Sequence, residues 1–127
     1  MITISELWVI SIGGALGTIT RYQLGLWISG KWNQGFPLHT FLINITGAFL
    51  LGFLNTLFIE RLTLSPLWRL GIGVGFLGGY TTFSTFGYEA ITLLEGGSYG
   101  TAAAYTLFTI FFGFIGVALG IGLARIL

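Results

Sequence analysis

Long apolar segments separated by short polar connections make up almost the whole of this 127-residue chain. Residues 32 to 59 contain no Asp, Glu, Lys or Arg, and neither do residues 96 to 124. Each stretch exceeds the roughly 20 apolar residues that a helix needs to cross a bilayer. Two further segments are interrupted by one charge each, Arg21 and Glu89. The pattern predicts an all-α integral membrane protein with one transmembrane domain over residues 1–127, whose four spans lie at about 7–28, 38–59, 70–94 and 99–124.

The connections between these spans are too short for a soluble domain. Pro66 suits the first turn of the third helix, because the amide hydrogen that proline lacks would have no partner there. Tryptophans lie near the predicted span ends, as interfacial anchors do: Trp8, Trp27, Trp32 and Trp68. The N-terminus has no basic region followed by a small-residue cleavage site, so we expect the first span to be retained.

Residues 78–86, Gly-Gly-Tyr-Thr-Thr-Phe-Ser-Thr-Phe, place two glycines and four Ser and Thr hydroxyls inside the third predicted span. Paired glycines loosen a helix, and backbone freed at membrane depth is tolerated only where protein or a watery cavity satisfies it. We therefore predict a buried break of the third helix near Gly78–Thr82. Clustered hydroxyls beside such a break suit a polar solute that has lost its water, which indicates an ion pathway.

Composition narrows the class of protein further. The chain is 54% hydrophobic and only 7% charged, where a soluble domain carries about 25%. A net charge of +1 without a basic patch argues against a nucleic-acid partner. The absence of cysteine excludes disulfides and thiolate chemistry. No Ser/His/Asp set, phosphate-binding glycine motif or HExxH motif is present, so we expect no enzymatic activity.

Helical spacing sorts the third span into two neighbouring stripes. Thr82, Thr85 and Glu89 follow an i, i+3, i+7 pattern, and Phe83 and Phe86 lie three residues apart beside them. Aromatic rings have a positive edge, so two rings turned edge-on can attract an anion without a full charge. A polar stripe beside an aromatic pair is what an anion pathway requires.

The second and fourth spans add polar positions at the same depth. Thr40 and Asn44 lie one turn apart, and Tyr105 and Thr109 do the same in the last span. For Asn44, a hydrogen bond between helices and a place in the pathway are equally good interpretations. Glycines four residues apart predict close helix packing: Gly13 with Gly17, Gly71 with Gly75, and Gly116 with Gly120.

Charged residues inside the spans are costly and need a reason. Arg21 is either an anchor that reaches the interface or an attractor for anions, and both interpretations stay open. His39 borders the second span, so we expect it to lie at the membrane interface. Because no carboxylate is near it in the sequence, it does not indicate a metal site. The charges that flank the spans favour neither orientation of the chain in the membrane clearly. Four packed helices leave no room for a pathway at their centre, so we expect a homo-oligomer.

These residues together resemble the Fluc (CrcB) family of small fluoride channels over the full length of the chain. The resemblance is carried by Gly13–Gly17 with Arg21 and Tyr22, by Thr40, Asn44 and Gly47, and by residues 78–86 with Glu89. It implies a fluoride-selective passive channel in the cell inner membrane that exports toxic fluoride from the cytoplasm. It also implies an antiparallel homodimer of subunits inserted in both orientations, with two pores.

By the same resemblance, particular residues take roles in conduction or ion binding. The implied ion pathway comprises Arg21, Thr40, Asn44, Phe83, Ser84, Thr85, Phe86, Glu89, Tyr105 and Thr109. A structural sodium ion (Na+) at the dimer interface would be held by the main-chain carbonyls of Gly78 and Thr81, in accord with the oxygen preference of hard cations. Gly113 and His39 depart from the family pattern, in which a hydroxyl and a glycine are common at those positions.

Two other functions fit four apolar spans. A small multidrug-type exporter needs a proton-coupling carboxylate deep in the first helix, whereas this helix has only Glu6 at its start. A non-transporting subunit of a larger membrane complex would explain the glycines as packing, but it leaves the run of hydroxyls and aromatic residues without a purpose.

Overall fold

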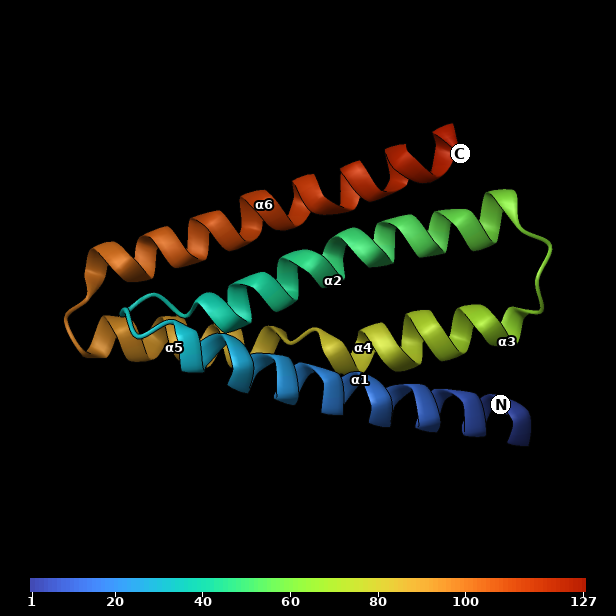
Figure 1. Ribbon diagram of the computed structural model, residues 1–127, viewed down its shortest axis with the longest axis horizontal. Helices are drawn as coiled ribbons and strands as arrows, with labels where there is room; N and C mark the ends of the chain where they lie inside the picture. Colours follow the sequence, from blue (N-terminus) through green and yellow to red (C-terminus); the bar gives the residue numbers. More distant parts are fainter.

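The computed structural model describes all 127 residues and contains only helices. Four helical rods run side by side, alternating in direction, with both termini at one end of the bundle (Figure 1). The rods are α1 (Ile4–Lys31), α2 (Leu38–Thr56) with its π-helical continuation η1 (Leu57–Arg61), a composite third rod, and α6 (Tyr99–Ile126). The third rod comprises α3 (Pro66–Arg69), the π-helix η2 (Leu70–Leu77), α4 (Gly78–Tyr80) and α5 (Phe83–Glu95).

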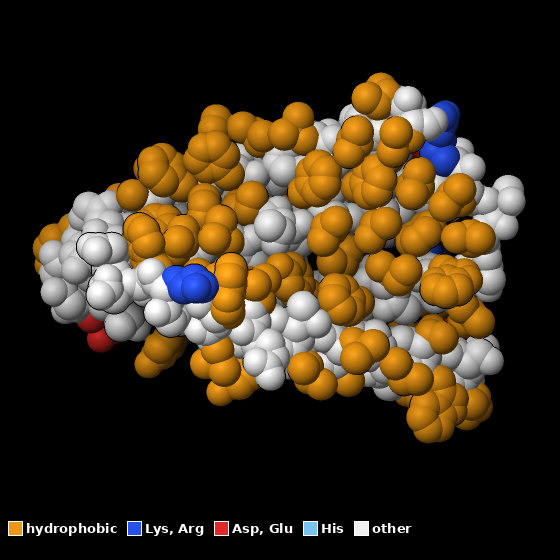
Figure 2. All heavy atoms as spheres, viewed as in Figure 1, with side chains coloured by type: hydrophobic (Ala, Val, Ile, Leu, Met, Phe, Trp, Pro, Cys, Tyr) orange, Lys and Arg blue, Asp and Glu red, His pale blue; other side chains and the backbone are white.

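Two of the rods are long and apolar enough to cross a membrane by length and composition, Leu38–Arg61 and Tyr99–Ile126. Most of the surface in Figure 2 consists of hydrophobic side chains, with a few charged groups among them. A soluble protein rarely exposes apolar patches of more than a few hundred Å². A surface that is mostly apolar is therefore typical of a protein embedded in the hydrocarbon of a membrane. The protein is therefore an all-helical membrane protein.

Helix ends follow the local sequence. Thr3 caps α1, and its backbone and side chain exchange hydrogen bonds with Glu6 in a capping box. Glu6 is thus used to begin the helix. Ser65 caps α3, and Pro66 occupies its first turn as predicted. Gly97 takes a positive φ of 82° in the turn between α5 and α6, a conformation that favours glycine.

Glycines bring the rods into backbone contact, which confirms the predicted close packing. A Cβ atom on Gly13 or Gly17 of α1 would collide with the η2 carbonyl oxygens of Gly71 or Phe76, respectively. The same is true of Gly120 in α6, which lies against the carbonyl of Phe49 in α2. Inside a membrane no hydrophobic effect draws helices together, so small residues that permit close approach are what hold the rods in contact.

The break in the third rod lies at the end of the predicted stretch and not at its glycines. Gly78 keeps helical angles (φ −63°, ψ −38°), whereas Thr81 (ψ 158°) and Thr82 (φ −153°) are extended. Gly79 serves packing instead, because a Cβ there would lie 2.6 Å from the Gly14 carbonyl oxygen. The glycines allow the rod to approach α1, and the two threonines interrupt the helix.

Candidate functional site

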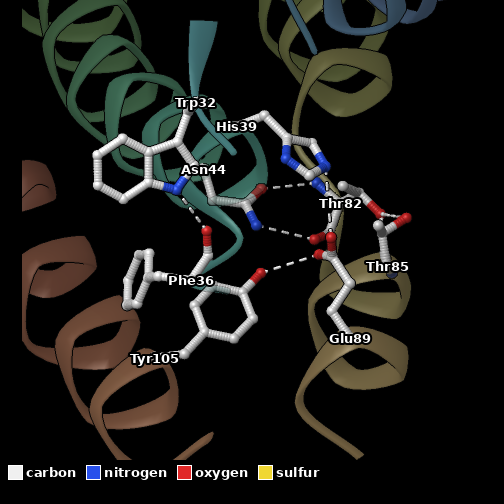
Figure 3. A network of polar contacts seen from close by, with 8 residues as sticks. All are labelled: Trp32, Phe36, His39, Asn44, Thr82, Thr85, Glu89 and Tyr105. Atoms are coloured by element: carbon white, nitrogen blue, oxygen red, sulfur yellow. Dashed lines mark hydrogen bonds and ion pairs between the residues drawn. The ribbon is translucent and has the colours of Figure 1, made fainter. Parts of the chain in front are cut away.

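The broken helix is held by one asparagine of α2. Asn44 Nδ2 donates to the Thr82 carbonyl oxygen at 2.9 Å, and the Thr82 amide donates to Asn44 Oδ1 at 2.8 Å (Figure 3). The side chain therefore satisfies both main-chain groups of one extended residue. Since an amide nitrogen carries two hydrogens, Asn44 keeps one donor beyond this pair. Asn44 thus joins α2 to the broken third rod by hydrogen bonds, and a second role in the ion pathway stays a prediction.

The same arrangement leaves main-chain carbonyls without their helical donors. In a continuous helix the Thr82 amide would bond to the Gly78 carbonyl, but it bonds to Asn44. The Thr85 amide would bond to the Thr81 carbonyl, but it donates to Thr82 Oγ1 at 3.2 Å. Gly78 is also exposed on the surface of the subunit. The break thus leaves two carbonyl oxygens free, and oxygen atoms are the ligands that a hard cation prefers.

Several hydroxyls near the break are occupied by protein partners. Thr81 Oγ1 donates to the Leu77 carbonyl at 2.9 Å, and Thr82 Oγ1 donates to Thr85 Oγ1 at 3.0 Å. The Thr85 hydroxyl hydrogen is left over, because Thr85 Oγ1 is the acceptor in that pair. Ser84 lies exposed beside it. Ser84 and Thr85 are therefore the hydroxyl donors that the break offers to a solute.

Aromatic rings in edge-to-face contact line the start of α5 and continue to α6. Phe83 and Phe86 have ring centroids 5.9 Å apart at 69°, and Phe86 meets Tyr105 at 5.1 Å and 81°. Phe36, from the α1–α2 connection, meets the other side of Tyr105 at 5.3 Å and 77°. Phe86 is buried, whereas the side of α5 that carries Phe83 faces outward, with Phe83 83% exposed.

Glu89 of α5 lies between two partners from other helices. The Tyr105 hydroxyl donates to Glu89 Oε1 at 3.0 Å, and His39 Nε2 of α2 lies 3.3 Å from Glu89 Oε2 (Figure 3). Tyr105 is fully buried, and Thr40, next to His39, is 2% exposed. A carboxylate, an imidazole and a phenol thus converge at one end of the bundle.

Thr109 carries the one buried side-chain polar atom that has no hydrogen-bond partner. A buried hydroxyl without a partner costs about 1–3 kcal/mol, so it persists only where something else compensates for the loss. Thr109 lies one helical turn from Tyr105 on α6. Its hydroxyl is therefore free to donate a hydrogen bond to a group outside this subunit.

Arg21 of α1 reaches the same region from the opposite side. Its Nε donates to the Gly79 carbonyl oxygen at 3.0 Å. The guanidinium lines a hollow of about 220 Å³ together with His39, Thr40, Thr82 and Thr85. Arg21 is thus bonded to the broken rod and placed beside a polar hollow, and its two sequence-based interpretations, as an interfacial anchor or as an attractor for anions, stay predictions.

Two residues of this region were not predicted from the sequence to belong to the site. His39 was expected at an interface without carboxylate neighbours, yet folding brings Glu89 against it. Phe36 lies in a connection that is folded back by the Trp32 indole, which donates to the Phe36 carbonyl at 2.8 Å (Figure 3). The position of His39, 50 residues before Glu89, carries no local signal of this contact.

Comparison of the chain with known proteins shows the family to which it belongs. Residues 8–121 match the family model described as CrcB-like protein, Camphor Resistance (CrcB). The chain belongs to the CrcB-like family. The matched range contains every residue of the candidate site, and the family resemblance inferred from the sequence is confirmed.

Several CrcB-like relatives are similar along nearly their whole length. A protein of Acidobacterium capsulatum named "Fluoride-specific ion channel FluC" is 46% identical over 114 residues, 90% of each chain. "Fluoride-specific ion channel FluC 1" of Listeria monocytogenes is 45% identical over 112 residues, which cover 88% of this chain and 91% of that protein. A Thermus thermophilus relative with the name FluC is 43% identical over 116 residues, with the same shares covered.

Proposed function

We propose that this protein is a membrane channel through which fluoride passes selectively and passively, as the names of its relatives suggest. The observation that supports this function most directly is the unpartnered hydroxyl of Thr109, which lies one helical turn from Tyr105, the ring that Phe86 contacts edge to face. These groups present hydrogen-bond donors and positive ring edges, which together favour a small anion.

Fluoride is small and strongly hydrated, so its water must be replaced by donors placed closely along the route. Ser84 and Thr85 at the break and Tyr105 and Thr109 on α6 supply such donors. Each station must bind weakly enough to release the ion to the next. Chloride is larger and a poorer hydrogen-bond acceptor, so it would recover less of its hydration free energy at the same stations.

We also propose that two antiparallel copies form the channel in the cell inner membrane, and that it exports fluoride from the cytoplasm. The 83% exposure of Phe83, next to a buried Phe86, supports a second copy that covers this part of α5. Four rods packed as a bundle enclose no channel of their own.

The orientation of each copy in the membrane can be tested with a single cysteine in place of Ser98, because the chain has no cysteine of its own. About half of the copies should react with an impermeant maleimide from outside.

A sodium ion between the two copies is the third part of the proposal. The carbonyls of Gly78 and Thr81 lack their helical donors, and Gly78 is exposed on the subunit, so these residues fit a hard cation. The ion would supply positive charge that offsets the aligned carbonyl dipoles. If it is structural, replacing sodium with N-methylglucamine should lower the thermal stability of the purified dimer without altering the subunit's helical content.

The function is tested by fluoride efflux from liposomes that contain the purified protein, followed with a fluoride electrode. We expect rapid fluoride loss and no chloride loss. Phe83→Ile keeps an apolar side chain but removes the ring edge, and it should abolish the flux. Phe114→Ile is the matched control, because Phe114 is also an exposed phenylalanine but lies on α6 away from the site.

Two outcomes would contradict the proposal. Equal fluoride and chloride loss would mean an unselective pore. No fluoride loss from a folded, homogeneous protein would favour a non-transporting role. Wild-type flux in Phe83→Ile would leave the channel function standing but would remove Phe83 from the pathway.

A further inference from the structure

His39 is the chain's only histidine, and the fold places it against the only carboxylate within the candidate site. Its Nε2 atom lies 3.3 Å from Glu89 Oε2, while the Tyr105 hydroxyl donates to the other carboxylate oxygen at 3.0 Å (Figure 3). Both oxygens of Glu89 therefore have a partner from another helix. The carboxylate is held by α2 on one side and by α6 on the other.

The imidazole is the more exposed of the two side chains. The side chain of His39 is 35% exposed and that of Glu89 is 19% exposed. His39 also lines the hollow of about 220 Å³ that contains Arg21 and Tyr22 of α1. The charged or titratable groups that face this region are thus Glu89 from α5, Tyr105 from α6, and Arg21 and Tyr22 from α1. A proton can reach His39 from water through this opening.

The charge of the pair depends on the imidazole alone if the carboxylate stays ionised. With a neutral His39, the pair carries one negative charge, which opposes an anion that passes beside it. When the second ring nitrogen binds a proton, His39 becomes a cation and the pair is neutral. Imidazole is the side chain whose charge ordinarily changes between about pH 5 and pH 8. Binding of a proton by His39 would therefore remove the negative charge that a passing anion meets at this pair.

We propose that His39 is a positioning residue that holds the Glu89 carboxylate and, by binding a proton, lowers the barrier to fluoride passing it. This inference rests on the proposed channel function. Fluoride flux should therefore rise as the pH is lowered on both sides of the membrane. Hydrogen fluoride also crosses lipid in acid, so flux is counted only above that of protein-free liposomes at the same pH.

The test compares efflux at about pH 8 and about pH 6 for three proteins. The wild type should gain roughly three- to tenfold at the lower pH, as expected for one added charge at a partly solvated site. His39→Gln keeps a side chain that can hydrogen-bond but does not titrate, so its flux should be low and independent of pH. His39→Lys carries a permanent charge, and its flux should stay near the acid value of the wild type at both pH values.

Further variants separate the histidine from its partner. Glu89→Gln removes the negative charge but leaves His39 able to bind a proton, so its flux should exceed that of the wild type at about pH 8 and still rise toward about pH 6. Glu95→Gln, which replaces an exposed carboxylate at the end of the same helix, should behave as the wild type does. A pH dependence that persists in His39→Gln but vanishes in Glu89→Gln would overturn the proposal and assign the titration to the carboxylate itself. Constant wild-type flux across the pH range would overturn it as well. No wild-type flux at any pH would instead contradict the channel function.

Discussion

The two halves of the third rod pack in opposite ways. Its first half, η2, touches α1 through glycines so closely that a single added methyl group would strike main-chain atoms. Its second half, α5, meets α2 and α6 through long polar and aromatic side chains, among them Glu89, Phe86 and Tyr105. The hollow of about 440 Å³ beside the glycine contact of the first half is lined mainly by apolar side chains, which offer an ion no hydrogen bonds. The second half offers partly exposed polar groups, and α6, which it contacts through Tyr105, carries the buried Thr109 hydroxyl that has no partner.

Because of this difference, we expect the first half of the rod to serve mainly the stability of the protein and the second half mainly its function. Close contact of small residues is what holds membrane helices together, because lipid is as apolar as the side chains. Unpartnered buried polar groups weaken a protein and persist only for a reason. Substitutions in the glycine contact should therefore unfold the protein, and substitutions at the polar end should change flux while the fold survives.

The largest effect is expected from Gly17→Ala in α1. The new Cβ would collide with the carbonyl of Phe76, and main-chain atoms cannot rotate away as a side chain does. We expect a loss of at least about 1–3 kcal/mol in the free energy of unfolding. Gly30→Ala, in the same helix, has open space around it and should be neutral or slightly stabilising. Thermal melting in detergent measures both, and equal melting temperatures would show that the α1–η2 contact relaxes.

Asn44→Ala comes next, because it removes both hydrogen bonds to Thr82. Two main-chain groups would lose these partners, at a net cost of about 1 kcal/mol for each hydrogen bond, because both bonds are only partly buried. Asn55→Ala, in the same helix, is the control and should cost less. Unchanged stability in Asn44→Ala would mean that water replaces the amide.

Asn44→Asp distinguishes the two roles left open for this residue. The carboxylate keeps an acceptor for the Thr82 amide, so part of the stability should return relative to alanine. Its negative charge should nevertheless oppose fluoride, and efflux should fall at least about tenfold if the anion passes nearby. Flux equal to that of the wild type would limit Asn44 to holding the broken helix.

Thr109→Val tests the unpartnered hydroxyl with a side chain of nearly the same shape. Stability should stay the same or rise, because no hydrogen bond is lost, while fluoride efflux should fall several-fold. Thr46→Val is the matched control, since the Thr46 hydroxyl lies 2.9 Å from that of Tyr80 and its loss should cost about 1 kcal/mol. If the two variants behave alike in melting and efflux, the Thr109 hydroxyl has no special role.

The smallest effect is expected at Arg21. Arg21→Lys keeps the charge but loses the bond from Nε to the Gly79 carbonyl, and Arg21→Gln loses the charge. If the charge attracts fluoride, only the glutamine variant should slow efflux, by about two- to fivefold, and more so at low ionic strength. If Arg21 is an anchor, both variants should instead lower the melting temperature and leave the salt dependence of efflux unchanged.

Features that depend on nearby residues could be predicted from the sequence. Charge-free segments predicted helices, Pro66 marked the start of the third rod, and residues 78–86 indicated that this rod is broken. Glycines spaced by four residues predicted the close contacts of α1 and α6. Each of these follows from apolar length, helical period or backbone freedom, which are properties of a short stretch of chain.

Which polar groups are paired was decided only by the tertiary structure. Asn44 completes the backbone of Thr82, His39 meets Glu89, and the hydroxyl of Thr109 alone is left without a partner. The break falls at Thr81 and Thr82, because Gly79 is needed against α1. A hydrogen bond depends on atoms meeting within about 3 Å, and residues 38 or 50 positions apart in the chain meet only once the helices have packed.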